Sequence, residues 1–184
     1  MSVKVLFVCM GNICRSPTAH AVMQHKLNER GLHHLIEVDS AGTHAYHVGE
    51  KSDSRSRQKA ASKGIDMEYI RARKIAITDH DDFDYILAMD SDNLELIEYY
   101  APSDAKARVA LFLSFANSEG LVNDTVVPDP YYGGDTGFEH VFSLVDKGCD
   151  ALINHIRKTD LAQDRVYVYR KIRSVGCASR NHRF

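Results

Sequence analysis

Features that would direct this 184-residue chain to a membrane or to a nucleic acid are missing. No apolar run reaches the roughly 18 residues that a membrane-spanning helix needs, and the first ten residues lack the length and cleavage pattern of a signal peptide. The formal net charge is only -2, so no overall charge attracts nucleic acid or a membrane surface. We therefore expect a cytoplasmic protein with no membrane insertion and no nucleic-acid partner.

Cysteine is also scarce, with four residues at positions 9, 14, 149 and 177. Four cysteines in a chain of this length do not make a disulfide framework, and no pair has the CxxC spacing of a zinc site. The histidine pairs at 33/34 and 44/47 lack the carboxylate or thiol partners of a recognisable metal site. The sequence therefore predicts no metal and no cofactor. The reducing cytoplasm would keep a thiol available for chemistry.

Hydrophobic residues make up 44% of the chain and charged residues 26%, which fits a folded domain. The charge is uneven, because residues 157–184 carry a net +6 and residues 1–156 a net -8. We predict a catalytic domain over residues 1–157 and a basic C-terminal extension of unknown role over residues 158–184. The extension could be a solvated segment, a docked strand or interface, or a recruiter of acidic partners. The strand-like alternation over Val166–Tyr169 favours some order.

Short apolar segments alternate with helical segments along the chain. The apolar runs predict strands at residues 3–8, 35–39, 85–89 and 109–113, with a loop over Ser40–Thr43. Helices are predicted from Ser16-Pro17-Thr18 to Gly31, over residues 55–63, after a cap at Asp90 and over residues 138–156. This order predicts an α/β fold with a four-stranded parallel sheet flanked by helices, in which ligands bind at the carboxyl ends of the strands.

One segment at such a strand end reads Cys9-Met10-Gly11-Asn12-Ile13-Cys14-Arg15-Ser16. Cysteine reacts as the thiolate, which a helix N-terminus, the Arg15 charge and a hydrogen bond from Ser16 would favour. The intervening residues can surround an oxyanion with backbone N–H groups, and Gly11 and Asn12 suit a tight backbone. The Arg15 guanidinium matches two phosphate oxygens. The segment therefore predicts a phosphate-binding loop around a nucleophile.

A proton donor for a leaving oxygen is offered by Val127-Pro128-Asp129-Pro130-Tyr131-Tyr132. Asp129 lies between two prolines before the final helix, where it could protonate the departing oxygen and later deprotonate the attacking water. Tyr131 and Tyr132 would offer aromatic walls for an aryl substrate, or could form a plain turn packed on that helix.

Four parts of the chain resemble the low-molecular-weight protein tyrosine phosphatase family. They are Val8–Pro17, Asp39–Thr43, Ala88–Asp90 with Asn93-Leu94, and Asp129–Tyr131. The resemblance implies the flavodoxin-like fold of that family. It also implies hydrolysis of phosphotyrosine in proteins, and of small aryl phosphates, through a cysteinyl-phosphate intermediate. The implied partners are tyrosine-phosphorylated proteins and phosphate or other oxyanions, and the implied assembly is a monomer or weak homodimer.

The resemblance also implies a role for each matching residue. Cys9 would be the nucleophile, Arg15 the phosphate ligand and Asp129 the general acid and base. The phosphate-binding loop would comprise Met10, Gly11, Asn12, Ile13, Cys14 and Ser16. Its support would come from Asn12, Ser16 and Ser40, and the substrate pocket would be walled by Ile13, Tyr46, Tyr131 and Tyr132. Cys14 resembles a second loop cysteine that forms a reversible disulfide with the nucleophile, although it could also be only a packed thiol.

Two departures and three alternatives accompany this resemblance. The segment Glu50–Arg55 lacks the proline that members often have, and Ile70 occupies a region where several members place a loop-supporting histidine. An arsenate reductase would need cysteines on a nearby redox segment, and Asp81–Asp92 has none. A protein arginine phosphatase tends to carry a small polar residue where the bulky Ile13 stands. A non-catalytic phosphoprotein-binding module is disfavoured by the intact nucleophile and acid.

Overall fold

Four parallel strands form one sheet in the computed structural model, which describes residues 2–131 and 133–177. The spatial order is β2-β1-β3-β4, with β1 at Val3–Cys9, β2 at Ile36–Gly42, β3 at Tyr85–Ala88 and β4 at Arg108–Leu111. This order matches the start of the flavodoxin-like order, in which ligands bind where the strand order reverses. The predicted four-stranded parallel α/β fold is confirmed.

The central strand β1 explains the continuous apolar run near the N-terminus. It pairs with β2 on one side and with β3 on the other, and Val5, Leu6, Phe7 and Val8 are fully buried. Residues on both faces of such a strand are covered, so the sequence does not alternate. The pairing continues to Cys9 opposite Gly42, which places Ser40–Gly42 inside β2. The predicted loop over Ser40–Thr43 is therefore wrong at its first three residues, because a partner strand extends them.

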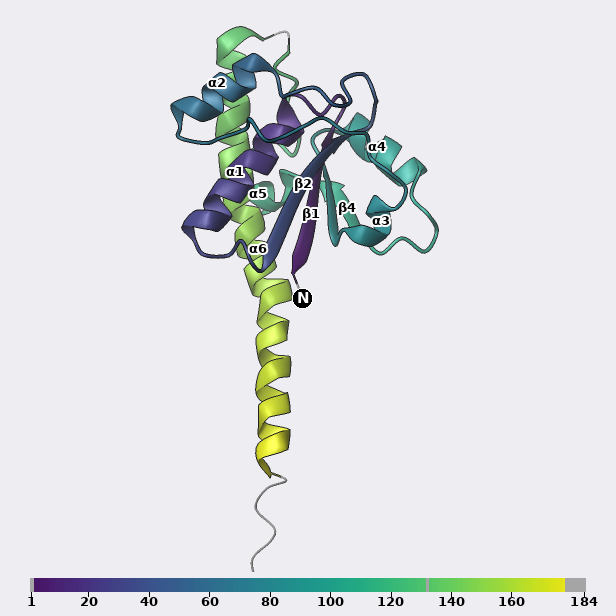
Figure 1. Cartoon of the computed structure of the whole chain (residues 1–184), viewed down its shortest axis with the longest axis vertical. Coiled ribbons are helices and arrows are strands. Elements are labelled where there is room, and N and C mark those ends of the chain that lie inside the picture. Colours follow the sequence, from purple (N-terminus) through teal and green to yellow (C-terminus); the bar gives the residue numbers. More distant parts are fainter. Residues whose placement is uncertain (1, 132, 178–184) are drawn as a thin grey trace, which may run out of the picture.

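Helices cover both faces of the sheet (Figure 1). On one face lie α1 (Arg15–Glu29), α2 (Ser54–Ser62), α5 (Ser114–Ser118) and the first part of α6 (Gly134–Cys177). On the other face lie α3 (Asp79–Asp82) and α4 (Ser91–Tyr99). Asp90 caps α4, as predicted, by accepting a hydrogen bond from the backbone N–H of Asn93. The short helices α3 and α5 have no helical repeat long enough to be recognised in the sequence.

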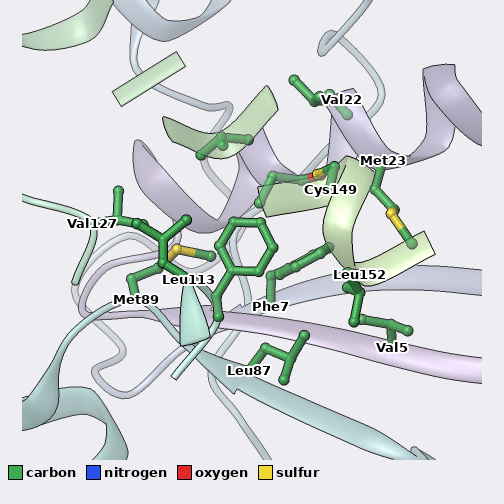
Figure 2. Packing of buried hydrophobic residues seen from close by; sticks show 14 of the residues in the cluster. Val5, Phe7, Val22, Met23, Leu87, Met89, Leu113, Val127, Cys149 and Leu152 are labelled. Carbon is green, nitrogen blue, oxygen red and sulfur yellow. The ribbon is translucent and has the colours of Figure 1, made fainter. Parts of the chain in front are cut away.

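The larger hydrophobic core lies between β1 and the helices α1 and α6. Phe7 packs edge-on against Phe112, with ring centroids 4.9 Å apart and an interplanar angle of 78°. Figure 2 shows Phe7 surrounded by side chains from several elements, including Leu113 and Leu152. Cys149 is fully buried in this cluster, so it belongs to the core.

The final helix is longer than the predicted span of residues 138–156. The backbone of α6 stays helical from Gly134 to Cys177, so the strand-like alternation at Val166–Tyr169 lies within a helix. An alternating pattern of four residues is too short to determine a strand when the surrounding residues are compatible with a helix and include no proline. The last part of α6 continues beyond the sheet layers (Figure 1). Within the described part of the chain, no helix combines the length and apolar character needed to cross a lipid bilayer.

Gly148 of α6 has no room for a larger side chain. A Cβ atom there would lie 2.5 Å from Cζ of Phe112 and 2.9 Å from Cδ2 of Leu113, both fully buried. We expect Gly148→Ala to lower the free energy of unfolding by about 1–3 kcal/mol, the usual cost of overpacking a core.

The matched control is Gly137→Ala in the same helix, where the nearest atom to a new Cβ would be 3.6 Å away on Pro130. Alanine should be tolerated there or should stabilise the helix slightly. Urea unfolding of both variants measures the difference. Equal stability of the two variants would contradict the packing account.

Candidate active site

The loop between β1 and α1 begins at Cys9 and ends where α1 starts at Arg15. Asn12 adopts the left-handed backbone conformation, with φ at 55°, which asparagine tolerates better than most residues. The loop lies directly on the end of β2. A Cβ atom on Gly42 would be 2.7 Å from the carbonyl oxygen of Met10 and 3.1 Å from the amide nitrogen of Asn12. Gly42 therefore allows a close backbone approach, a role that the sequence analysis did not assign.

Three hydrogen bonds converge on the buried hydroxyl of Ser16. Its Oγ lies 3.0 Å from Sγ of Cys9 and accepts a hydrogen bond from Nδ2 of Asn12 at 2.9 Å. It also lies 3.2 Å from the carbonyl oxygen of Ala41, to which it can donate. A hydroxyl has one proton, so it can be donated to the sulfur when the sulfur is a thiolate. The structure thus brings together the predicted loop residues Cys9, Asn12 and Ser16.

Arg73 provides loop support that the sequence analysis missed. Its backbone N–H donates to Oδ1 of Asn12 at 3.0 Å, which holds the amide that binds Ser16. Its guanidinium pairs with Asp39 at 2.8 Å and with Asp79 at 2.9 Å. This network connects the loop to β2 and α3 in a chain that carries Ile70 where a supporting histidine was expected. No motif links these positions in sequence, so only the fold could reveal them.

Ser40, the third predicted support residue, lies one step further from the loop. Its side chain is buried, and its Oγ is 3.3 Å from Nδ1 of His20 on α1. Its backbone N–H donates to Oδ1 of Asp39 at 2.7 Å. A role for Ser40 in supporting the loop therefore runs through its neighbours and stays a prediction.

Arg15 is almost fully buried and faces two carboxylates. Its Nη1 is 2.5 Å from Oδ2 of Asp90 and donates to the carbonyl oxygen of Val127 at 3.2 Å, while Nη2 is 3.4 Å from Oδ2 of Asp129. Burial alone would lower the pKa of Arg15, but the nearby Cys9, Asp90 and Asp129 raise it above its ordinary value. The guanidinium therefore stays charged beneath the loop. The sequence predicts Asp90 as a helix cap and as part of a family-like motif, but it predicts no contact with Arg15, although Asp90 follows β3 at the same sheet edge as Cys9.

Asp129 reaches the loop although 120 positions separate it from Cys9 in the sequence. The backbone N–H of Val127 donates to the carbonyl oxygen of Met89, which fastens the Asp129 segment to the end of β3. Oδ1 of Asp129 accepts a hydrogen bond from the backbone N–H of Tyr131 at 3.0 Å, and Oδ2 faces Arg15. The side chain is exposed enough to meet a substrate.

These groups line one pocket of about 330 Å³. Cys9, Arg15 and Asp129 share it with the predicted wall residues Ile13, Tyr46 and Tyr131. Tyr46 is 71% exposed and Tyr131 48% exposed, so both rings stand at the mouth. Tyr132 lies outside the described residues. Met10, Gly11, Cys14 and His47 also line the pocket, and of these only His47 was not predicted as a site residue.

Arg55 positions the Tyr131 side of the mouth. Its guanidinium lies over the Tyr131 ring, 5.3 Å from the centroid, and donates to the Tyr131 carbonyl oxygen at 3.2 Å. The same guanidinium pairs with Asp53, whose side chain caps α2. The backbone N–H of Asp53 in turn donates to the carbonyl oxygen of Ile13 at 2.8 Å. The parts of the pocket lining formed by Ile13 and Tyr131 are therefore joined through the start of α2.

Cys14 is buried in the same loop. Burial, together with the negative charges of Asp53 and Cys9, raises the pKa of Cys14 to about 12. At neutral pH its side chain is therefore a protonated thiol. The described residues contain no group of three or more histidine, cysteine or carboxylate side chains that could hold a metal ion.

The arrangement defines a hydrolase site that works through a cysteine. The thiol of Cys9 lies at the end of β1 and lines one pocket with the buried guanidinium of Arg15 and the carboxyl group of Asp129. Residues 4–163 match the profile of the family described as low molecular weight phosphotyrosine protein phosphatase. The chain belongs to this family and is a phosphatase, as the sequence predicted.

Individual relatives agree with the family match. A low molecular weight phosphotyrosine protein phosphatase of Schizosaccharomyces pombe is 44% identical over 147 residues, which cover 79% of this chain and 92% of that protein. The crystal structure of a protein tyrosine phosphatase from Entamoeba histolytica has a TM-score of 0.80 at 39% identity, covering 85% of this chain and 98% of that one. The structure of a Drosophila arginine phosphatase has a TM-score of 0.79 at 33% identity, covering 86% and 100%.

His20 makes the support of the site sensitive to pH. Burial, reinforced by Arg73 and opposed by Asp39, lowers the pKa of His20 from 6.5 to about 4. Between these values the unfolded chain binds a proton that the folded chain does not. Stability should therefore fall as the pH is lowered from about 6.5 towards 4, with a slope of up to about 1.4 kcal/mol per pH unit from this group.

Urea unfolding of the wild type and of His20→Gln at several pH values between 4.5 and 7 isolates this effect. Other groups titrate in both proteins, so only the difference between the two curves reports on His20. We expect the difference to shrink as the pH falls. Parallel curves would contradict the assigned pKa.

Proposed function

We propose that this protein hydrolyses phosphotyrosine in proteins, and small aryl phosphates, through a cysteinyl-phosphate intermediate. The observation that carries the proposal is the pocket in which a thiol, a buried guanidinium and a carboxyl group converge between two tyrosine rings. Cys9 and Arg15 are buried, whereas Asp129 and the two tyrosines are exposed, which suits a phosphate that reaches the thiol while its flat ring lies beside the tyrosines.

The two chemical steps use the same carboxyl group in opposite directions. The Cys9 thiolate attacks phosphorus and forms the S–P bond while the P–O bond to the aryl group breaks. Asp129 gives its proton to the departing oxygen. Asp129 then takes a proton from a water molecule that attacks the phosphoryl group, which breaks the S–P bond and restores the thiolate. Arg15 and the loop N–H groups bind the equatorial oxygens throughout.

The role of Asp129 is tested by the basicity of the leaving group. We expect Asp129→Ala to lower kcat by about 10²-fold or more on phenyl phosphate and phosphotyrosine peptides. The loss should be much smaller on 2,4-dinitrophenyl phosphate, whose leaving group needs no proton. The measurement is kcat across a series of aryl phosphates.

Asp129→Asn is the matched control, because an amide can keep the hydrogen bond from the Tyr131 N–H while it cannot donate the acidic proton. It should show the same dependence on the leaving group as the alanine variant. Cys9→Ser should abolish turnover in every case. Residual activity above about a tenth of the wild type after Cys9→Ser would overturn the proposed nucleophile, since the thiolate carries the reaction.

Ile13 distinguishes an aryl substrate from phosphoarginine. Its side chain lines the pocket beside Cys9, where a branched apolar group packs against a phenyl ring and leaves a guanidinium without a polar partner. We expect Ile13→Thr to raise the ratio of phosphoarginine to phosphotyrosine turnover several-fold. Ile13→Val, which shortens the side chain without adding a hydroxyl, is the control. An unchanged ratio in Ile13→Thr would count against this selectivity.

We further propose that Cys14 protects Cys9 from irreversible oxidation. Peroxide would convert the Cys9 thiolate to a sulfenic acid, with the peroxide reduced to water. The Cys14 sulfur would then form a disulfide with Cys9, and its proton would leave with the displaced hydroxide as water. The support is that both thiols line the same pocket, where Cys14 also senses the charge of Cys9.

Peroxide treatment of the wild type and of Cys14→Ser tests the protective role. The wild type should recover most of its activity after addition of dithiothreitol, because a disulfide is reducible. Cys14→Ser should recover little, because its sulfenic acid proceeds to the sulfinic acid. Cys149→Ser, which removes a thiol from the core, should recover like the wild type. Equal recovery of all three proteins would overturn the proposal.

Location, assembly and domain division are proposals of the same kind. A cytoplasmic location fits a reaction that needs a reduced thiol. Residues 1–157 would carry the chemistry, and the basic extension over residues 158–184 would serve another purpose. A monomer or weak homodimer stays the expected assembly. Sedimentation and activity of the full chain and of a chain truncated after residue 161 address these points, because Asp160 still accepts a hydrogen bond from the hydroxyl of Tyr85.

A further inference from the structure

A second pocket of about 350 Å³ lies on the sheet face covered by α4. Its walls come from the loop after β2, from the segment around Lys74–Ile77 and from the later turns of α4. It shares no lining residue with the catalytic pocket. The reaction described above makes no use of it.

A buried imidazole in the wall has hydrogen-bonding capacity that the protein leaves unused. His80 is 2% exposed, and its Nδ1 has no hydrogen-bond partner among the described residues. Burial lowers the pKa of His80 despite the opposing charges of Asp79 and Asp81, so the ring is neutral at pH 7. A neutral imidazole offers one donor and one acceptor, and native proteins seldom bury such a group unpaired.

The remaining walls combine one cation with apolar and ring-bearing side chains. Lys74 lines the pocket, and the carboxylates of Asp39 and Asp79 pair with Arg73. Ile77 and Tyr100 are 66% and 64% exposed, which leaves large apolar surfaces uncovered at this pocket. An aromatic body would bury these surfaces, and a carboxylate would meet the ammonium of Lys74.

The pocket is linked to the catalytic loop by short hydrogen bonds. The backbone N–H of Thr43 donates to the carbonyl oxygen of Cys9 at 2.8 Å, and that of His44 donates to the carbonyl oxygen of Met10 at 3.0 Å. The His44 ring stacks on Tyr46, with centroids 5.2 Å apart and planes 12° from parallel. Thr43 and His44 therefore face the second pocket, while Tyr46 stands at the mouth of the first.

We propose that this pocket is a second ligand site, which binds small aromatic carboxylates and alters substrate binding through residues 43–46. The ring lies against Tyr100 and the isoleucines, and the carboxylate pairs with Lys74 and accepts a hydrogen bond from the imidazole of His80. A ligand in this pocket also contacts His44, whose ring stacks on Tyr46, so binding changes the packing of Tyr46 and affects KM for aryl phosphates more than kcat.

The binding test uses 2-naphthoate as the probe and calorimetry on the full chain, with the catalytic loop saturated by orthovanadate. We expect binding to persist under these conditions and to weaken at least tenfold for uncharged 2-naphthamide. Lys74→Met should weaken naphthoate binding at least tenfold, and His80→Phe should also weaken it, because phenylalanine has no hydrogen-bonding nitrogen to offer the carboxylate. Lys106→Met, which removes the same charge outside the pocket, should bind like the wild type. Loss of binding with vanadate, or equal binding by Lys74→Met, would overturn the site.

The coupling test measures phosphotyrosine peptide hydrolysis with increasing naphthoate. We expect KM to change at least twofold in the wild type and in Lys106→Met, and to stay constant in Lys74→Met. The calorimetric result does not depend on turnover, so it decides the site even if the proposed reaction were wrong. Binding without any change in KM would overturn the coupling through residues 43–46.

Discussion

The hydroxyl of Ser16 is the point on which the site depends. It joins the end of β1 at Cys9, the left-handed residue of the loop at Asn12 and the end of β2 at Ala41. These groups come from three places in the fold and are buried, with Cys9 open to the catalytic pocket. A buried hydrogen-bond network of this kind fixes a single arrangement, because each unsatisfied member would cost free energy. The loop is therefore shaped before any phosphate arrives, and binding energy need not be spent on ordering it.

The positive charge at this loop is the guanidinium of Arg15, which is held by carboxylates from two other segments of the chain. Arg15 is the first residue of α1, Asp90 caps the start of α4, and Asp129 lies in the segment that Val127 fastens to the end of β3. All three positions come together at the carboxyl edge of the sheet, where parallel topology gathers strand ends that are distant in sequence. The network of Arg73 with Asp39 and Asp79 stands beside it and holds Asn12. Charged residues at this edge of the sheet therefore include both the proposed reacting groups and the residues that hold the loop in place.

The sequence predicted the features that lie within contiguous segments. The apolar run near the N-terminus predicts strand β1, and the spacing of Cys9 and Arg15 before a helix start predicts the loop. The prolines and tyrosines around Asp129 predict the segment that carries the acid. The support of the loop by Arg73, the position of His47 in the pocket and the contact of Arg55 with Tyr131 could not be predicted, because each joins segments that only the tertiary fold brings together. The ends of β2 and α6 were misplaced for a related reason. Strand ends depend on the partner strand, and a short alternating stretch does not determine helix or strand.

The packing at Gly42 has a consequence for how this chain can vary. The approach to the Met10 carbonyl excludes a side chain of any kind at this position, whether small, polar or apolar. Hydropathy, charge and strand propensity would all score an alanine there as harmless. Natural variants and designed relatives that keep every reacting group but lose this glycine would thus be folded proteins with a displaced loop. The space between the backbone at position 42 and the Met10 carbonyl would then distinguish active members from inactive ones, although a comparison of their functional groups would show no difference.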